Sequence, residues 1–139
     1  MKLLENKVII VTGGSRGIGE GIVLKLAENG ANIAFTYVSS DEKALALEEK
    51  IKTLGVKAKA YKSNAGVYQD CEAMVNDVVK EFGTVDICVN NAGISKDNLL
   101  LRMTPEQWDE VMTTNLKSVF NMTKQVIRPM KKSKKGSII

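Results

Sequence analysis

The chain has 139 residues, a length that accommodates one domain and not two sizeable cores. Hydrophobic residues make up 44% and charged residues 26%, so we expect one ordinary globular domain over residues 1–139 and not a disordered or fibrous chain. The net charge is only +4, and an aromatic content of 5% argues against a nucleic-acid-binding surface.

Strand and helix signals alternate along the chain. Short apolar runs predict strands at residues 7–12, 31–38, 56–63 and 85–90, with a fifth beginning at 137–139. Apolar positions at helical spacing predict helices at 16–29, 39–54, 67–82 and from 105 to about 128. Ser39 and Glu42 have the spacing of a capping box, and Pro129 is expected to end or kink the last helix.

This alternation predicts an α/β fold, a doubly wound parallel sheet of the Rossmann type that is incomplete on its C-terminal side. Parallel strands need a crossover, and here each crossover contains a helix. Ligands of such sheets bind beyond the carboxyl ends of the strands. We therefore expect the residues just after the first, second and fourth strands to line one crevice.

The first turn of this sheet is rich in glycine and reads TGGSRGIG from Thr12 to Gly19. A pyrophosphate must approach the backbone N–H groups at a helix N-terminus, and a Cβ at Gly13 or Gly17 would obstruct the turn or this approach. Gly19 is expected to allow close packing of the helix on the strand. A purely structural turn is the alternative, but a strand before and a helix after favour a dinucleotide site. No Gly-Lys-Ser/Thr follows, which argues against a P-loop.

The end of the second strand lacks the carboxylate that usually binds the ribose 2′-OH of NAD, since residues 33–40 contain no acid. Arg16, Tyr37, Ser39 and Ser40 are instead suited to a 2′-phosphate, and this predicts NADPH. The alternative is a solvated Arg16.

Two further stretches interrupt ordinary secondary structure. Asn90–Gly93 reads NNAG, in which the asparagines can tie a loop to backbone and the small residues leave room for a flat ligand; a plain turn is the alternative. Thr113–Asn115 are three consecutive weak helix formers inside a long helix. They can open the helical ladder beside a ligand or water, unless they are simply tolerated in a well-packed helix.

Cysteine and histidine usage limits the possible chemistry. Histidine is absent, and Cys71 and Cys88 form no CxxC pair, so no metal site is expected and the two cysteines are predicted to be buried free thiols. The longest apolar runs have four residues, and residues 1–7 lack the apolar stretch of a secretory signal. We expect a cytoplasmic protein with no membrane span.

Together, TGGSRGIG, NNAG and the NLKSVF stretch of Asn115–Phe120 resemble the short-chain dehydrogenase/reductase family over essentially the whole chain. Asn90–Phe120, with DNLLLRM at residues 97–103, resembles more narrowly the bacterial 3-oxoacyl-[acyl-carrier-protein] reductases of fatty-acid synthesis. The resemblance implies NADPH-dependent reduction of a 3-oxoacyl thioester to the 3-hydroxyacyl form, in a homotetramer. Alternatives are another short-chain reductase of a sugar, steroid or small ketone, and a non-catalytic dinucleotide-binding subunit.

The resemblance also implies roles for single residues. Asn115 would be the family's catalytic asparagine, Asn64 would lie against the adenine, and Asn91–Gly93 would border the adenosine ribose. The expected cofactor-binding residues are Gly13, Ser15, Arg16, Gly17, Ile18, Gly19, Tyr37, Ser39, Asn64, Ala65, Asn91, Ala92 and Gly93.

One departure from the family pattern is large. The family's active-site Ser and Tyr-x-x-x-Lys follow the fifth strand, whereas this sequence ends at Ile139, and none of its three tyrosines has a lysine four residues later. We therefore expect the chain to be a segment of a longer protein.

A basic cluster precedes the fifth strand. It consists of Arg128, Lys131, Lys132, Lys134 and Lys135, with no acid among them. The cluster lies next to where the resemblance places the active site, and because acyl carrier proteins are acidic we expect it to steer the carrier. A solvated basic turn is the alternative.

Overall fold

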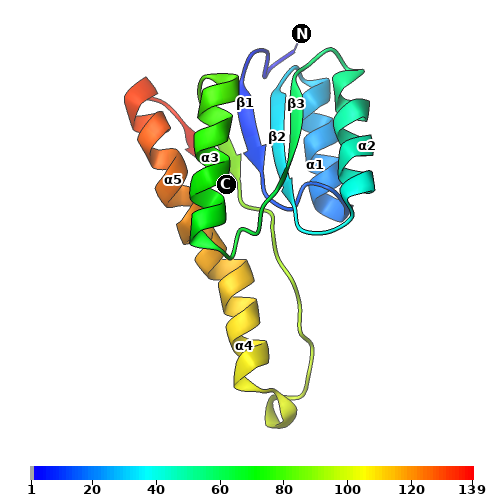
Figure 1. The fold of residues 1–139 in the computed structure, drawn as a ribbon, viewed down its shortest axis with the longest axis vertical. Helices are drawn as coiled ribbons and strands as arrows, with labels where there is room; N and C mark the ends of the chain where they lie inside the picture. Colours follow the sequence, from blue (N-terminus) through cyan, green and yellow to red (C-terminus); the bar gives the residue numbers. More distant parts are fainter. Residues whose placement is uncertain (1) are drawn as a thin grey trace.

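The computed structural model describes residues 2–139, which form a five-stranded parallel sheet in the order β3-β2-β1-β4-β5 (Figure 1). The strands are β1 (Val8–Val11), β2 (Asn32–Tyr37), β3 (Ala58–Lys62), β4 (Ile87–Val89) and β5 (Ser137–Ile138). The α-helices are α1 (Gly17–Glu28), α2 (Asp41–Lys52), α3 (Tyr68–Phe82), α4 (Pro105–Met112) and α5 (Ser118–Ser133). A 3-10 turn at Leu100–Arg102 precedes α4, and a π-helical turn at Thr113–Lys117 joins α4 to α5.

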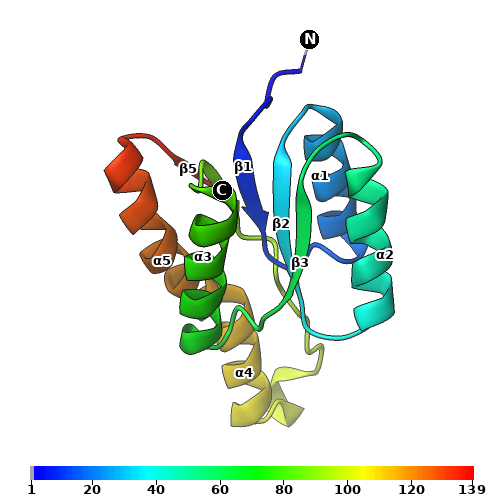
Figure 2. The same cartoon turned by 45° about the horizontal axis from the view of Figure 1, so that its top comes forward.

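Strand β1 shows why the sheet is covered on both faces. All four of its residues are buried, and it pairs in parallel with β2 and with β4. Ile9 and Val11 pack with residues of α1 and α2, whereas Val8 and Ile10 pack with residues of α3 and α5. The two pairs of helices lie on opposite sides of the sheet (Figure 2). Since successive strand residues point to opposite faces, an unbroken apolar run is what a doubly covered strand requires. The predicted fold class is confirmed.

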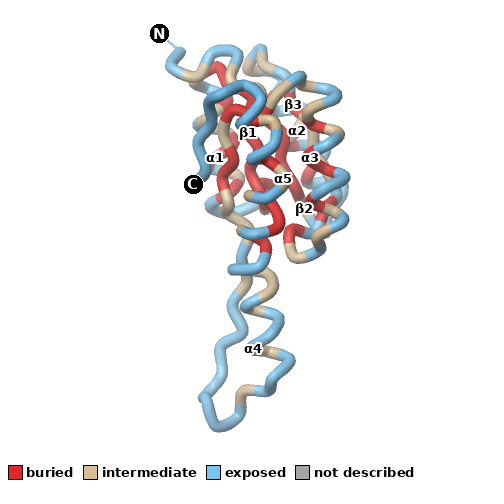
Figure 3. Tube along the Cα trace, turned by 90° about the vertical axis from the view of Figure 1, so that its left-hand side faces the viewer, coloured by how far each residue is buried: buried red, intermediate tan, exposed pale blue. Residues whose placement is uncertain are grey.

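Helix α4 and the loop before it form an arm that extends beyond the carboxyl edge of the sheet (Figure 3). Much of the arm is exposed, and Leu101 near its tip is 99% exposed. Thr104 and Gln107 form a capping box, and Pro105 occupies the first turn of α4. Among residues 2–139 no helix is both long and apolar enough to cross a membrane.

Pro129 was expected to end or kink the last helix; it does not end it, because α5 continues through Pro129 to Ser133. A proline removes only its own N–H, so the helix loses one hydrogen bond, to the carbonyl of Gln125. Met130, the next residue, is 8% exposed and packs in the core, which holds the last turn against the sheet. The helix ends where Lys134 takes the left-handed conformation, at φ 59°.

The expected capping box of Ser39 and Glu42 does not form. Ser40 is the N-cap of α2, its φ is 67°, and no side-chain cap hydrogen bond is made there. A capping side chain normally reaches the first-turn N–H groups from extended backbone, which a left-handed Ser40 does not provide. Both serines line the pocket at the carboxyl edge of the sheet instead.

Candidate functional site

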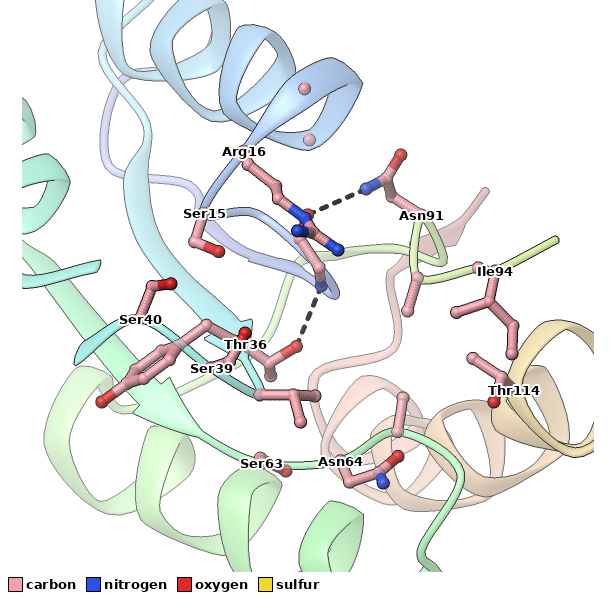
Figure 4. Close-up of a pocket in the computed structure, with 18 of the residues that line it drawn as sticks. Ser15, Arg16, Thr36, Ser39, Ser40, Ser63, Asn64, Asn91, Ile94 and Thr114 are labelled. Atoms are coloured by element: carbon pink, nitrogen blue, oxygen red, sulfur yellow. Dashed lines mark hydrogen bonds between the residues drawn. The ribbon is translucent and has the colours of Figure 1, made fainter. Parts of the chain in front are cut away.

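A pocket of about 690 Å³ lies at the carboxyl edge of the sheet (Figure 4). Its walls come from the turn after β1, the end of β2 with the start of α2, the loops after β3 and β4, and the arm. The predicted crevice after the first, second and fourth strands is thereby confirmed.

All 13 expected cofactor-binding residues line this pocket. Eight further lining residues are Thr36, Val38, Ser40, Lys43, Ser63, Ile94, Glu110 and Thr114. Most of the additions directly extend segments already identified, so a wider window at each strand end would have found them. Glu110 comes from the arm and Thr114 from the π-helical turn that follows it, and no local pattern specifies the position of either segment.

The glycine turn is shaped by three different constraints. Gly13 and Gly17 have φ of +64° and +57°, which favours glycine, and a Cβ on Gly17 would meet no atom within 4 Å. A Cβ on Gly19 would overlap the carbonyl oxygen of Gly13. Gly19 therefore packs on the turn itself, whereas close packing on the strand was expected. A Cβ on Gly14 would lie 2.7 Å from the Cβ of Phe35, a packing constraint that the sequence did not reveal.

Thr12 joins the glycine turn to the loop after β4. Its hydroxyl oxygen accepts hydrogen bonds from the backbone N–H groups of Asn91 and Ala92, both at 3.0 Å. The side-chain amide of Asn91 donates in return to the carbonyl oxygens of Thr12 and Gly13, both at 3.1 Å. Thr12 is 1% exposed, so these bonds fix two walls of the pocket from a buried position.

The pocket also has a hydrogen bond from the end of β2 and two cationic side chains, one from the glycine turn and one from α2. The hydroxyl of Thr36 accepts the N–H of Gly13 at 3.0 Å, which ties the glycine turn to β2. The side chain of Arg16 extends into the pocket in Figure 4, and Lys43 lines the pocket from the first turn of α2. Neither cation is ion-paired with a carboxylate of residues 2–139.

The loop after β3 is held from both sides. The N–H of Gly66 donates to the side-chain oxygen of Asn64 at 2.9 Å, and the buried Asn121 of α5 donates to the carbonyl of Ala65 at 3.0 Å. The side-chain oxygen of Asn64 is thus engaged within its own loop. An adenine contact of Asn64 stays a prediction.

Asn115 lies in the π-helical turn, where the sequence has its three weak helix formers. Its side chain pairs with the backbone of Ile94 in both directions: the oxygen accepts the Ile94 N–H at 2.7 Å, and the amide donates to the Ile94 carbonyl at 2.8 Å. Ile94 and Thr114 line the pocket, but Asn115 does not. The arrangement can position the loop after β4, and the catalytic role of Asn115 stays a prediction.

The basic cluster lies far from the pocket, so the expectation that it is next to the site was wrong for a single chain. Arg128, Lys131 and Lys132 lie near the C-terminal end of α5, and Lys134 and Lys135 follow that helix. The whole cluster comes directly before β5, which runs parallel to β4. The start of a parallel strand lies at the amino edge of the sheet, which is opposite to the pocket (Figure 1).

The two cysteines are both free and buried, as predicted. Burial raises the pKa of Cys71 to about 11 and that of Cys88 to about 12. Nucleophilic thiol chemistry requires the thiolate, so these side chains behave as core residues.

Comparison with known proteins identifies the family. The family described as short chain dehydrogenase matches residues 7–139. The chain is 48% identical over 134 residues to the 3-oxoacyl-[acyl-carrier-protein] reductase FabG of Staphylococcus epidermidis, covering 96% of this chain and 55% of that protein. It is 46% identical over 136 residues to the protein of the same name from Vibrio cholerae, covering 98% and 54%.

Comparison with solved structures agrees with this family assignment. An NAD⁺-bound xylitol dehydrogenase matches with a TM-score of 0.93 and 30% identity, covering 99% of this chain and 53% of that one. A short chain dehydrogenase from Burkholderia cenocepacia in complex with NADP matches with a TM-score of 0.88 and 36% identity, covering 91% and 51%. The chain belongs to the short-chain dehydrogenase family, and it spans about half the length of the curated relatives that it matches.

Proposed function

We propose that the pocket binds NADPH. The observation that carries this proposal is the combination of an open glycine turn with two cations that line the pocket and form no ion pair within residues 2–139, Arg16 of that turn and Lys43 of α2. Gly17 leaves space above the start of α1, where backbone N–H groups can receive a pyrophosphate. Arg16 would pair with the 2′-phosphate, and no carboxylate from residues 33–40 competes for that position. Bound NADPH would supply a hydride.

We propose further that the whole protein reduces the 3-oxo group of an acyl thioester carried on an acyl carrier protein. Support comes from the names of the relatives at 46–48% identity, which cover nearly all of this chain. The runner-up is another short-chain reductase, of a sugar, steroid or small ketone; the likeness to a xylitol dehydrogenase favours the sugar.

In this reading Asn115 acts on the reaction through position. Its two hydrogen bonds hold the backbone of Ile94, which lines the pocket beside Thr114. The π-helical turn widens the helix at that point, and the altered ladder can direct a backbone carbonyl to a water or substrate.

Self-association would place the basic cluster of one chain near the pocket of another. The long α4–α5 segment has a stripe of apolar side chains, each at least 37% exposed, made of Trp108, Met112, Leu116, Phe120 and Ile127. Two copies that pair through the same stripe about a two-fold axis across the helices have antiparallel helices. The basic end of one α5 then lies toward the pocket edge of the other chain, where it can attract an acidic carrier. A homotetramer built on such pairs is part of the proposal.

The test of the cofactor proposal is a calorimetric titration with NADPH and with NADH. Arg16→Ala should weaken NADPH by about 10- to 150-fold, the range of a lost charged hydrogen bond, and NADH much less. Lys25→Ala, in the last turn of the same helix, is the matched control and should change neither. Equal affinity of the unmodified protein for both dinucleotides would contradict the proposal.

The substrate proposal is tested on the whole protein by comparing kcat/KM for a carrier-bound 3-oxoacyl thioester and for a small ketone. A clear preference for the small ketone would favour the runner-up.

A further inference from the structure

The charges around the end of β2 form a pattern that the glycine turn alone does not explain. Lys43 lines the pocket from the first turn of α2, close in the chain to Ser39 and Ser40, which also line it. It is exposed, and among residues 2–139 no carboxylate is paired with it. An unpaired cation at a pocket wall is free to bind an anion.

Asp41 is the acid nearest in sequence to this wall, and its charge is occupied elsewhere. Its carboxylate oxygen lies 3.4 Å from the ammonium nitrogen of Lys62, at the end of β3. Asp41 does not line the pocket, although its neighbour Tyr37 does. The pKa of Tyr37 is raised, first by burial and next by the negative charge of Asp41.

Lys43 and Asp41 carry opposite charges, and each would act on a phosphate bound at this wall. A phosphate monoester carries a charge of about −1.5 to −2 at neutral pH, so it is attracted by a free lysine and repelled by a free carboxylate nearby. The Lys62–Asp41 pair is more than half exposed, so it adds little to folding stability. Its consequence lies in the electric field at the pocket wall, where the ammonium of Lys62 offsets the negative charge of Asp41.

We propose that Lys43 is a second cation for the 2′-phosphate of the dinucleotide, and that Lys62 promotes the same selectivity indirectly by pairing with Asp41. This rests on the proposed binding of NADPH. Lys43 is then a specificity-determining residue, and Lys62 is a positioning residue that does not touch the ligand.

The direct role of Lys43 is tested by calorimetry with 2′,5′-ADP and 5′-AMP, which differ by the 2′-phosphate. Lys43→Gln should weaken 2′,5′-ADP about three- to tenfold and leave 5′-AMP unchanged, as expected for an exposed charge acting on a doubly charged group. Lys50→Gln is the matched control, because Lys50 is exposed on the same helix about 10 Å farther along and does not line the pocket. Equal effects of the two substitutions would overturn the role of Lys43.

The indirect role of Lys62 is tested by a double-mutant cycle with Asp41. Lys62→Gln should weaken 2′,5′-ADP about two- to fivefold, because it leaves the carboxylate of Asp41 unpaired. Adding Asp41→Asn should restore the affinity. A double variant as weak as Lys62→Gln would overturn the proposal, since Lys62 would then contact the phosphate itself.

The same titrations separate this inference from the function it rests on. If the unmodified protein binds 2′,5′-ADP no better than 5′-AMP, the proposed NADPH preference fails together with the inference. If it prefers 2′,5′-ADP and loses that preference with Arg16→Ala but not with Lys43→Gln, the function stands and the role of Lys43 is refuted.

Discussion

Replacing Thr12 by valine removes one hydroxyl and leaves two backbone N–H groups without their acceptor. The hydroxyl accepts from Asn91 and Ala92 at 3.0 Å, in a part-buried position. A buried donor left unpaired costs about 1–3 kcal/mol, and some water can reach this pair, so we expect Thr12→Val to cost about 2–4 kcal/mol. By the average unfolding entropy for 139 residues, this corresponds to a Tm lower by about 7–14 °C.

Urea unfolding of matched variants measures this cost. Thr36→Val is the control, because Thr36 is equally buried and its hydroxyl accepts only one N–H, that of Gly13 at 3.0 Å. We expect it to cost about half as much, and Thr12→Ser, which keeps the hydroxyl, to cost less than Thr12→Val. A Thr12→Val variant no less stable than Thr36→Val would refute the view that this hydroxyl holds the two loops together.

The remaining predictions concern the π-helical turn and the thiols. In the whole protein, Asn115→Leu should abolish most turnover and speed hydrogen exchange of the Ile94 amide while Tm stays within a few degrees, because the side chain is exposed and its lost partners are local; near-normal turnover would return Asn115 to a tolerated helix residue. Burial raises the pKa of Cys71 and Cys88 above the ordinary value of 9.0, to about 11 and about 12, so ionisation favours the unfolded chain. The contribution of the two thiols to the free energy of unfolding in urea should therefore be fully present below about pH 9 and decrease as the pH rises toward 11. A Cys71→Ala/Cys88→Ala variant should lose less stability over this pH range. An identical loss in both proteins would assign it to other groups.

The sheet and most of its pocket were predictable from the sequence because each signal is local. The run at Val8–Val11 is apolar on both faces, and the glycines after it stand at a helix start, where a phosphate can approach backbone N–H groups. Parallel strands bring their carboxyl ends to one edge, so any polar or glycine-rich segment that follows a strand is a candidate wall. That rule placed Asn91 in the pocket, whereas Asn64, which follows β3, was expected there only from the family resemblance.

Features that depend on tertiary contacts were not predictable. The helix passes through Pro129 because Met130 is anchored in the core, and Ser40 adopts a left-handed conformation that no capping pattern implies. The importance of Thr12 is equally hidden, since its hydroxyl serves residues 79 and 80 positions later in the chain. The local structure at these residues depends more on their tertiary contacts than on their intrinsic secondary-structure propensity.

The misplaced basic cluster has a different cause, because the sequence did contain the information. In a parallel sheet a crossover helix runs back against the strands, so its C-terminal end returns to the amino edge. Arg128 to Lys135 come directly before β5 and therefore belong to that edge, whereas ligands bind at the other. A residue just after a strand and a residue just before one lie at opposite edges of the sheet, however close they are in sequence. For the cluster to act on a carrier at the pocket, a second chain with the opposite helix direction must supply it, which makes self-association through the α4–α5 stripe a requirement of the carrier proposal.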